Sequence, residues 1–155
     1  MHIPRRFVPF VIGLAVASSI VAPRPVQAST AQAQQRLFGL IDVLRQKYPA
    51  LRDRTEYGLG TLDEGATEIY RENFQAGTTY VVVAVGCDTA QDIDIAIANE
   101  RGKILTADTD RSAAAAVIFE PQHTGTYLIG VNMAATTSGD TAHFAYQVFY
   151  VDVER

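Results

Sequence analysis

Residues 92–98 read Asp92-Ile93-Asp94-Ile95-Ala96-Ile97-Ala98, and this stretch decides the fold class. Its three isoleucines alternate strictly with polar or small residues. That period of two is typical of a β-strand that buries one face and leaves the other open. The stretch therefore predicts a half-buried strand, and the sequence on both sides of it continues in a similar way.

Short runs rich in β-branched and aromatic residues, separated by turn residues, follow one another after Asp53. The expected strands cover 55–62, 66–74, 78–86, 92–98, 103–107, 114–119, 126–133 and a closing strand with Phe144, Tyr146, Val148 and Tyr150 on one face. The run 78–86 is too apolar to be exposed on both faces, whereas the small residues of 134–142 predict a mobile loop. Strands at this spacing, without alternating helices, predict an antiparallel β-sandwich or barrel.

One amphipathic helix is expected before the strands, over 31–48. Apolar residues recur there at helical spacing: Leu37, Leu40, Ile41, Leu44 and Tyr48. Ser29 or Thr30 can cap the start and Pro49 can end the helix. We expect the helix to pack on the domain; the alternative is an arm that binds a partner.

The first residues have the pattern of a secretory signal peptide. Arg5 and Arg6 precede an apolar run over 7–22, and small residues close the segment at Ala28. The run is short for a membrane span, so cleavage after Ala28 is expected, with no stable membrane insertion afterwards; the alternative is an uncleaved membrane anchor. The expected divisions are a signal peptide over 1–28, the helical segment over 29–53 and the sandwich over 54–155.

Composition and charge exclude several classes of protein. The chain has 155 residues, of which 48% are apolar and 19% charged, so it is not expected to be disordered. Removing residues 1–28 takes away three arginines and no acid. The remaining 127 residues keep 10 of the 13 basic residues and all 17 acidic ones, a net charge of −7. This balance argues against nucleic-acid binding, which needs a basic face.

Several short motifs occur together in an order that resembles a known family. They are 74–80 (FQAGTTY), 92–95 (DIDI), 99–102 (NERG) and 124–131 (TGTYLIGV). In this order they resemble the bacterial pre-peptidase C-terminal domain, and the resemblance covers about residues 66–151. It implies a jelly-roll-like antiparallel β-sandwich, here preceded by one amphipathic helix. Relatives carry paired cysteines in this region, whereas this chain has only Cys87. The disulfide of those relatives is therefore not expected here.

Five aspartates are the candidate metal ligands: Asp88, Asp92, Asp94, Asp108 and Asp110. Carboxylates gathered at a strand edge are ligands that Ca²⁺ prefers, and some modules of the resembled family bind calcium. The alternative is structural, since acids in turns often accept hydrogen bonds from backbone N–H groups. A glycosidase-like pair of acids is a weaker alternative. No cofactor other than Ca²⁺ is expected.

Cys87, His123 and His143 are the other residues with possible chemistry. Cys87 is either a reactive thiol, a partner in an intermolecular disulfide, or a half-buried unpaired cysteine. The two histidines lie outside any metalloprotease motif.

We therefore expect a secreted or periplasmic, non-enzymatic binding or accessory module. Its partner would be an exported protein, a polysaccharide or the cell surface. Two alternatives remain: a small hydrolase that uses His123 or His143 with an acid, and a structural subunit that docks through its helix.

Overall fold

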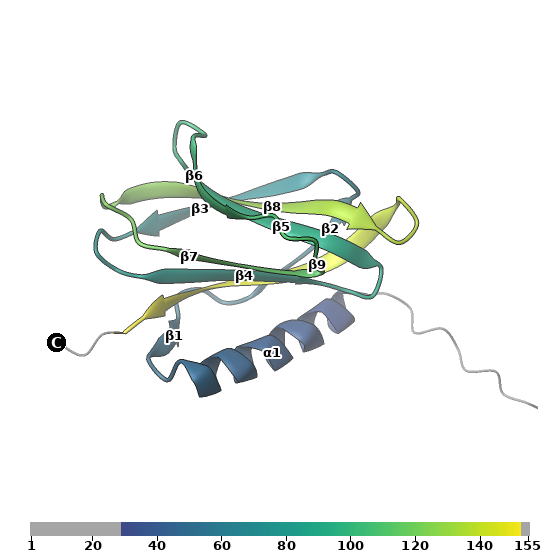
Figure 1. Cartoon of the computed structure of the whole chain (residues 1–155), viewed down its shortest axis with the longest axis horizontal. Coiled ribbons are helices and arrows are strands. Elements are labelled where there is room, and N and C mark those ends of the chain that lie inside the picture. The colour runs from purple at the N-terminus through teal and green to yellow at the C-terminus, as the bar shows by residue number, and fades with distance from the viewer. Residues whose placement is uncertain (1–28, 153–155) are drawn as a thin grey trace, which may run out of the picture.

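Two antiparallel sheets and one helix make up residues 29–152, the part of the chain that this computed structural model describes (Figure 1). The predicted signal peptide lies outside these residues. The elements are α1 (Thr30–Lys47), β1 (Leu51–Asp53), β2 (Gly58–Asp63), β3 (Thr67–Phe74), β4 (Tyr80–Gly86), β5 (Ala90–Asn99), β6 (Ile104–Asp108), β7 (Ala114–Phe119), β8 (Gly125–Thr136) and β9 (Thr141–Val151). The predicted fold class, a mainly antiparallel β-sandwich with one helix before it, is confirmed.

Sheet 1 has the strand order β1-β9-β4-β7, and β2 pairs with β9 on the same side as β1. Sheet 2 has the order β3-β8-β5-β6. The two sheets lie face to face, as Figure 1 shows, and their inner side chains form one apolar core. No helix among residues 29–152 is long and apolar enough to span a membrane.

The alternating stretch that predicts a half-buried strand lies in β5. Ile93, Ile95 and Ile97 are fully buried between the sheets. Asp92 and Asp94 lie on the opposite, partly exposed face. The predicted alternation is confirmed.

Helix α1 forms a third layer on the outer face of sheet 1 (Figure 1). Ser29 is the N-cap, and its hydroxyl accepts a hydrogen bond from the backbone N–H of Gln32. The buried face of the helix consists of Ala33, Leu37 and Ile41. Because α1 covers one face of β4 and sheet 2 covers the other, β4 is buried on both faces, which explains its continuous apolar sequence.

The edge of sheet 1 beside α1 differs from the prediction. The strand expected from residue 55 begins at Gly58, and a short strand β1 that was not expected pairs with the far end of β9. Residues 54–57 lie between β1 and β2 and bulge away from β9. The backbone N–H groups of Arg54 and Thr55 both donate to the carbonyl of Val148 and hold the base of this bulge.

The prediction of a mobile loop over 134–142 was wrong for most of its length. Strand β8 continues to Thr136 and β9 begins at Thr141, so only 137–140 connect them. The carboxylate of Glu64 accepts hydrogen bonds from the backbone N–H and the hydroxyl of Thr136, at 2.7 and 3.1 Å. These contacts with the β2–β3 turn extend β8 through a sequence of low strand propensity.

Candidate functional site

The five predicted calcium ligands do not lie together. Asp88 lies in the connection from β4 to β5, where its carboxylate contacts Arg36 and Gln32 of α1. Asp92 and Asp94 lie on β5, and Asp108 lies at the end of β6 beside them. Asp110 follows in the β6–β7 connection. The structure therefore brings together Asp92, Asp94 and Asp108 and separates Asp88 from them.

Two of these neighbouring carboxylates already accept hydrogen bonds from the backbone. Asp92 accepts from the N–H of Ser112 at 3.2 Å. Asp108 accepts from the N–H groups of Asp110 and Ala116, at 3.2 and 2.9 Å, and so links the edges of the two sheets. Burial, followed by the charges of Asp92 and Asp108, raises the pKa of Asp94.

Within residues 29–152, no three His, Cys, Asp or Glu side chains are arranged to hold a metal ion. Calcium binding by these aspartates stays a prediction, and it would require their carboxylates to turn toward one another. A melting temperature that rises in millimolar CaCl₂ and falls again in EDTA would support it, because a ligand of the folded state stabilises that state. Equal melting temperatures in both would end it.

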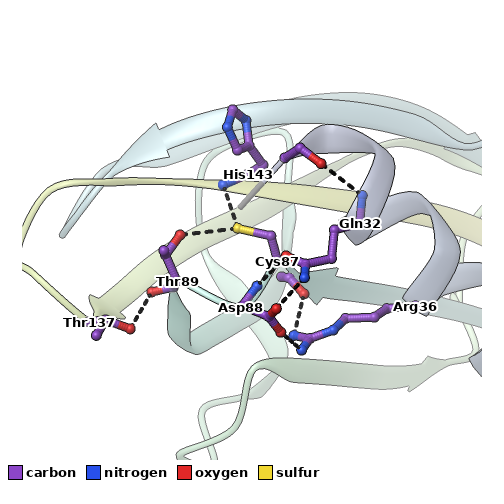
Figure 2. A network of polar contacts seen from close by, with 9 residues as sticks. Gln32, Arg36, Cys87, Asp88, Thr89, Thr137 and His143 are labelled. Atoms are coloured by element: carbon purple, nitrogen blue, oxygen red, sulfur yellow. Dashed lines mark hydrogen bonds and ion pairs between the residues drawn. The ribbon is translucent and has the colours of Figure 1, made fainter. Parts of the chain in front are cut away.

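Cys87 is fully buried rather than half-buried. Figure 2 shows its sulfur between Thr89 and the backbone of His143, with the imidazole of His143 directed away. The sulfur lies 3.1 Å from the hydroxyl of Thr89 and accepts from the N–H of His143 at 3.3 Å. Burial raises the pKa of the thiol. The hydrogen bonds with Thr89 and His143, together with those from the backbone of Thr89 and Ala90, lower it by more than burial raises it. The net result is a pKa below the ordinary value of a thiol. An intermolecular disulfide would require the residues that cover the sulfur to move.

The first turns of α1 are attached beside this cysteine by a polar cluster (Figure 2). Arg36 forms an ion pair with Asp88 and also donates to the carbonyl of Gly86 at 3.0 Å. Gln32 accepts from the backbone N–H of Asp88 at 2.8 Å. Asp88, a predicted metal ligand, thus attaches the helix to the sandwich.

The two histidines lie at opposite ends of β4. His143 adjoins Cys87 at the end of that strand, and its Nδ1 lies 2.7 Å from the hydroxyl of Thr61. His123 follows Pro121, whose carbonyl accepts from Gly77 just before the strand begins. Within residues 29–152, neither imidazole forms an ion pair or hydrogen bond with a carboxylate. The hydrolase hypothesis stays a prediction.

A groove of about 840 Å³ lies between α1 and residues 54–57. Phe38, Asp42 and Arg45 line it from the helix, since their spacing places them on one helical face. Ile41 and Gln147, both nearly fully buried, form its floor. The groove brings together aromatic, charged and buried polar side chains from α1, from residues 54–57 and from β9.

The far wall of the groove is held by specific contacts. The Gln147 side chain donates to the carbonyl of Thr55 at 3.0 Å. The Tyr57 hydroxyl accepts from the side chain of Gln34 at 2.8 Å. The rings of Tyr57 and Phe38 pack edge to face with centroids 5.2 Å apart, yet they remain 39% and 41% exposed. The wall is therefore preorganised and presents aromatic surface to solvent.

The charges around the groove are unequally compensated. Arg45 donates to both carboxylate oxygens of Asp53 at 2.7 Å, which neutralises that pair. Arg54 points to the carbonyl of Asn73 on the other side of the bulge. The carboxylates of Asp42 and Glu56 have no ion-pair partner among residues 29–152. The lining of the groove therefore carries three carboxylates, of Asp42, Asp53 and Glu56, and two guanidinium groups, of Arg45 and Arg54.

Sequence reasoning missed most of this groove. Phe38 could be recognised only as a widening of the apolar helical face, and Glu56 and Tyr57 were assigned to a strand. The available signal was the polar stretch 53–56, which carries charge where a half-buried strand would alternate.

Comparisons with known proteins place the chain in no family. No protein-family model matches it, and no curated protein matches its sequence significantly. Two natural proteins of known structure are similar at a TM-score of 0.48. One is PliG of Aeromonas hydrophila, a periplasmic inhibitor of g-type lysozyme, at 17% identity over 61% of this chain and 84% of that one. The other is the pre-peptidase C-terminal domain of a collagenase from Bacillus anthracis, at 12% identity over 60% and 87%.

A de novo designed double-stranded β-helix matches at a TM-score of 0.34 and 15% identity, over 61% of this chain and 99% of that one. A pre-peptidase C-terminal domain, which the sequence motifs resemble, is thus among the similar structures. Membership of that family stays a prediction, because similarity at this level is too distant to assign a family or a function.

Proposed function

We propose that this chain is a non-catalytic, exported binding module that holds a protein partner in the groove between α1 and residues 54–57. The observation that carries the proposal is the groove itself, which is lined by the exposed Phe38–Tyr57 pair and by the carboxylates of Asp42 and Glu56, neither of which has an ion-pair partner among residues 29–152. Export is proposed from the signal-peptide pattern of residues 1–28.

A protein partner fits this groove better than a polysaccharide does. Protein interfaces are centred on partly exposed aromatic side chains with charged groups at the rim. A sugar ring would stack on the open face of an aromatic ring, but the edge of one ring of this pair packs against the face of the other, at an interplanar angle of 89°. The sequence also contains no tryptophan.

Charge reversal at the rim tests the proposal. The variant Asp42→Lys/Glu56→Lys changes two exposed residues that form no ion pair within residues 29–152, so its fold should be retained. The matched control Asp110→Lys/Glu120→Lys makes the same change in net charge. These two exposed residues flank β7, which forms the opposite edge of sheet 1 from β1 and β2.

The immobilised chain 29–155 and both variants would be incubated with the exported proteins of the source cells, and the retained proteins quantified. We expect a protein that the wild type and the control retain and the groove variant loses. Equal retention by all three chains would contradict the proposal.

A further inference from the structure

The free edges of the two sheets are protected against pairing with another chain, with one exception. On β7, the outward N–H of Ala116 is already bound by Asp108. Strand β3 carries the charged residues Glu68, Arg71 and Glu72 along its length, and β6 is short, with a register shift opposite Ile97 and Ala98. Charges, bulges and short strands are the usual means by which proteins prevent edge-to-edge association.

Strand β2 has neither a charged side chain along most of its length nor a bulge in its pairing with β9. Its sequence over 58–63, Gly-Leu-Gly-Thr-Leu-Asp, has no lysine, arginine or proline, and its single charge is at the end. Among residues 29–152 it pairs with β9 alone, on one side. Its other side is therefore an open edge.

The register shows which backbone groups this edge presents. His143 directs its N–H and its carbonyl toward Cys87, on the β4 side. In an antiparallel ladder, its partner Thr61 then directs its own N–H and carbonyl away from β9. The same alternation applies to Leu59, two residues earlier. No hydrogen bond among residues 29–152 uses these outward backbone groups.

The side chains at the start of this edge lie close in sequence to Tyr57, which lines the groove. Leu59, which is 42% exposed, lies on the same outer face of sheet 1 as α1. It follows Tyr57, whose ring packs on Phe38. A strand placed beside β2 would therefore have apolar surface under its side chains and the carboxylates of Asp42 and Glu56 near one end.

We infer that the partner contributes an extended, basic segment that pairs with the open edge of β2 as an additional strand. The inference rests on the proposed function and names the form and charge of the partner. Backbone hydrogen bonds to Leu59 and Thr61 would supply the pairing, and the apolar patch would accept alternate side chains. Lysine or arginine side chains would meet Asp42 and Glu56, in a chain whose residues 29–155 carry a net charge of −7.

A random library of short peptides displayed on phage, selected against residues 29–155, provides the probe. We expect the selected peptides to be rich in lysine or arginine and free of proline at their centre. A synthetic peptide of the selected sequence should slow hydrogen exchange at the amides of Leu59 and Thr61, and its Kd should rise with ionic strength.

Thr61→Pro is the decisive variant. Proline removes the outward N–H at the edge but no hydrogen bond of the β2–β9 ladder, a position at which strands tolerate it. We expect the peptide Kd to increase about tenfold or more. Thr61→Val is the control, because it keeps the N–H and loses only the hydroxyl that contacts His143. If Thr61→Pro fails to fold, the Asp42→Lys/Glu56→Lys variant and the amide exchange of the wild type decide the question.

The results separate this inference from the proposed function. Four results would overturn strand pairing. The selected peptides could lack basic residues, leave the amides of Leu59 and Thr61 exchanging rapidly, or bind Thr61→Pro as tightly as the wild type. The selection could also yield no peptide at all. If the natural partner is still lost by the groove variant in that case, the proposed function stands without strand pairing. If the groove variant also keeps the partner, the proposed function fails too.

Discussion

Asp94 is a carboxylate whose ionisation opposes folding. It lies on the outer face of β5, and burial and the charges of Asp92 and Asp108 raise the pKa of its carboxyl. A raised pKa means that the folded state binds the proton more tightly than the unfolded state does. The contribution of this group to stability is therefore complete at low pH and is lost as pH rises through the folded-state pKa.

Asp94→Asn is accordingly expected to raise the melting temperature at pH 7. The gain should shrink as pH is lowered through the pKa of Asp94, because both proteins are then neutral at this position. The change in melting temperature is measured by circular dichroism at a series of pH values between about pH 3 and pH 7. This is the range over which carboxyl groups titrate. Asp110→Asn, an exposed change of the same charge, is the control. A gain that is equal for both variants would show that overall charge, not the Asp92–Asp94–Asp108 group, is responsible.

Two glycines of this chain should respond oppositely to alanine. A Cβ at Gly60 would lie 2.4 Å from the ring of the fully buried Phe144, so Gly60→Ala must displace a core aromatic. We expect a loss of about 1–3 kcal/mol in the free energy of unfolding. Gly39 lies in α1 with no atom within 4 Å of the added Cβ, so Gly39→Ala should gain about 1 kcal/mol. Urea unfolding measures both values, and a Gly60→Ala protein as stable as the wild type would contradict the close packing of β2 on this ring.

At the scale of the element, α1 packs on the sandwich through one buried face. Leu37 is fully buried in the same apolar core as β4 and β9. Leu37→Ala is therefore expected to lower the free energy of unfolding by about 2–5 kcal/mol. Val43, on the same helix but 60% exposed, is the control, and Val43→Ala should change stability by less than about 0.5 kcal/mol. Chemical denaturation of both variants makes the comparison, and equal stabilities would mean that the helix does not pack as described.

The elements that could be predicted are those whose pattern is local. The period of the helix, its Ser29 cap and the alternation of Ile93, Ile95 and Ile97 are all contained in short stretches of sequence. Strand β1 could not be predicted, because a strand of three residues exists only through pairing with β9, about a hundred residues later. The same reason hides the groove, whose wall depends on Gln147 reaching Thr55. The periodicity of the sequence therefore could not predict most of the groove. The aspartates were predicted as metal ligands from their residue type alone, which does not show whether their carboxylates converge.

At the scale of the whole molecule, the chain passes between the two sheets at most of its connections. The links from β2 to β3, β3 to β4, β4 to β5, β6 to β7, β7 to β8 and β8 to β9 each join one sheet to the other. Strand β9, the last along the chain, pairs with β1, β2 and β4. Neither sheet is a continuous segment, so neither can form its hydrogen bonds without most of the chain in place.

We therefore expect residues 29–155 to unfold in a single cooperative transition in urea, helix included. Far-UV circular dichroism follows the strands and α1. Near-UV circular dichroism follows the packed tyrosines, because the chain has no tryptophan and the rings of Tyr70 and Tyr146 stack with centroids 4.0 Å apart between the sheets. The two signals should change at the same urea concentration, which is the test of two-state behaviour. Leu37→Ala should shift both midpoints together, because the helix packs on β4 and β9, which also contribute to the core between the sheets. A far-UV change that precedes the tyrosine signal in this variant would mean that α1 detaches first, and the groove would then open before the sandwich unfolds.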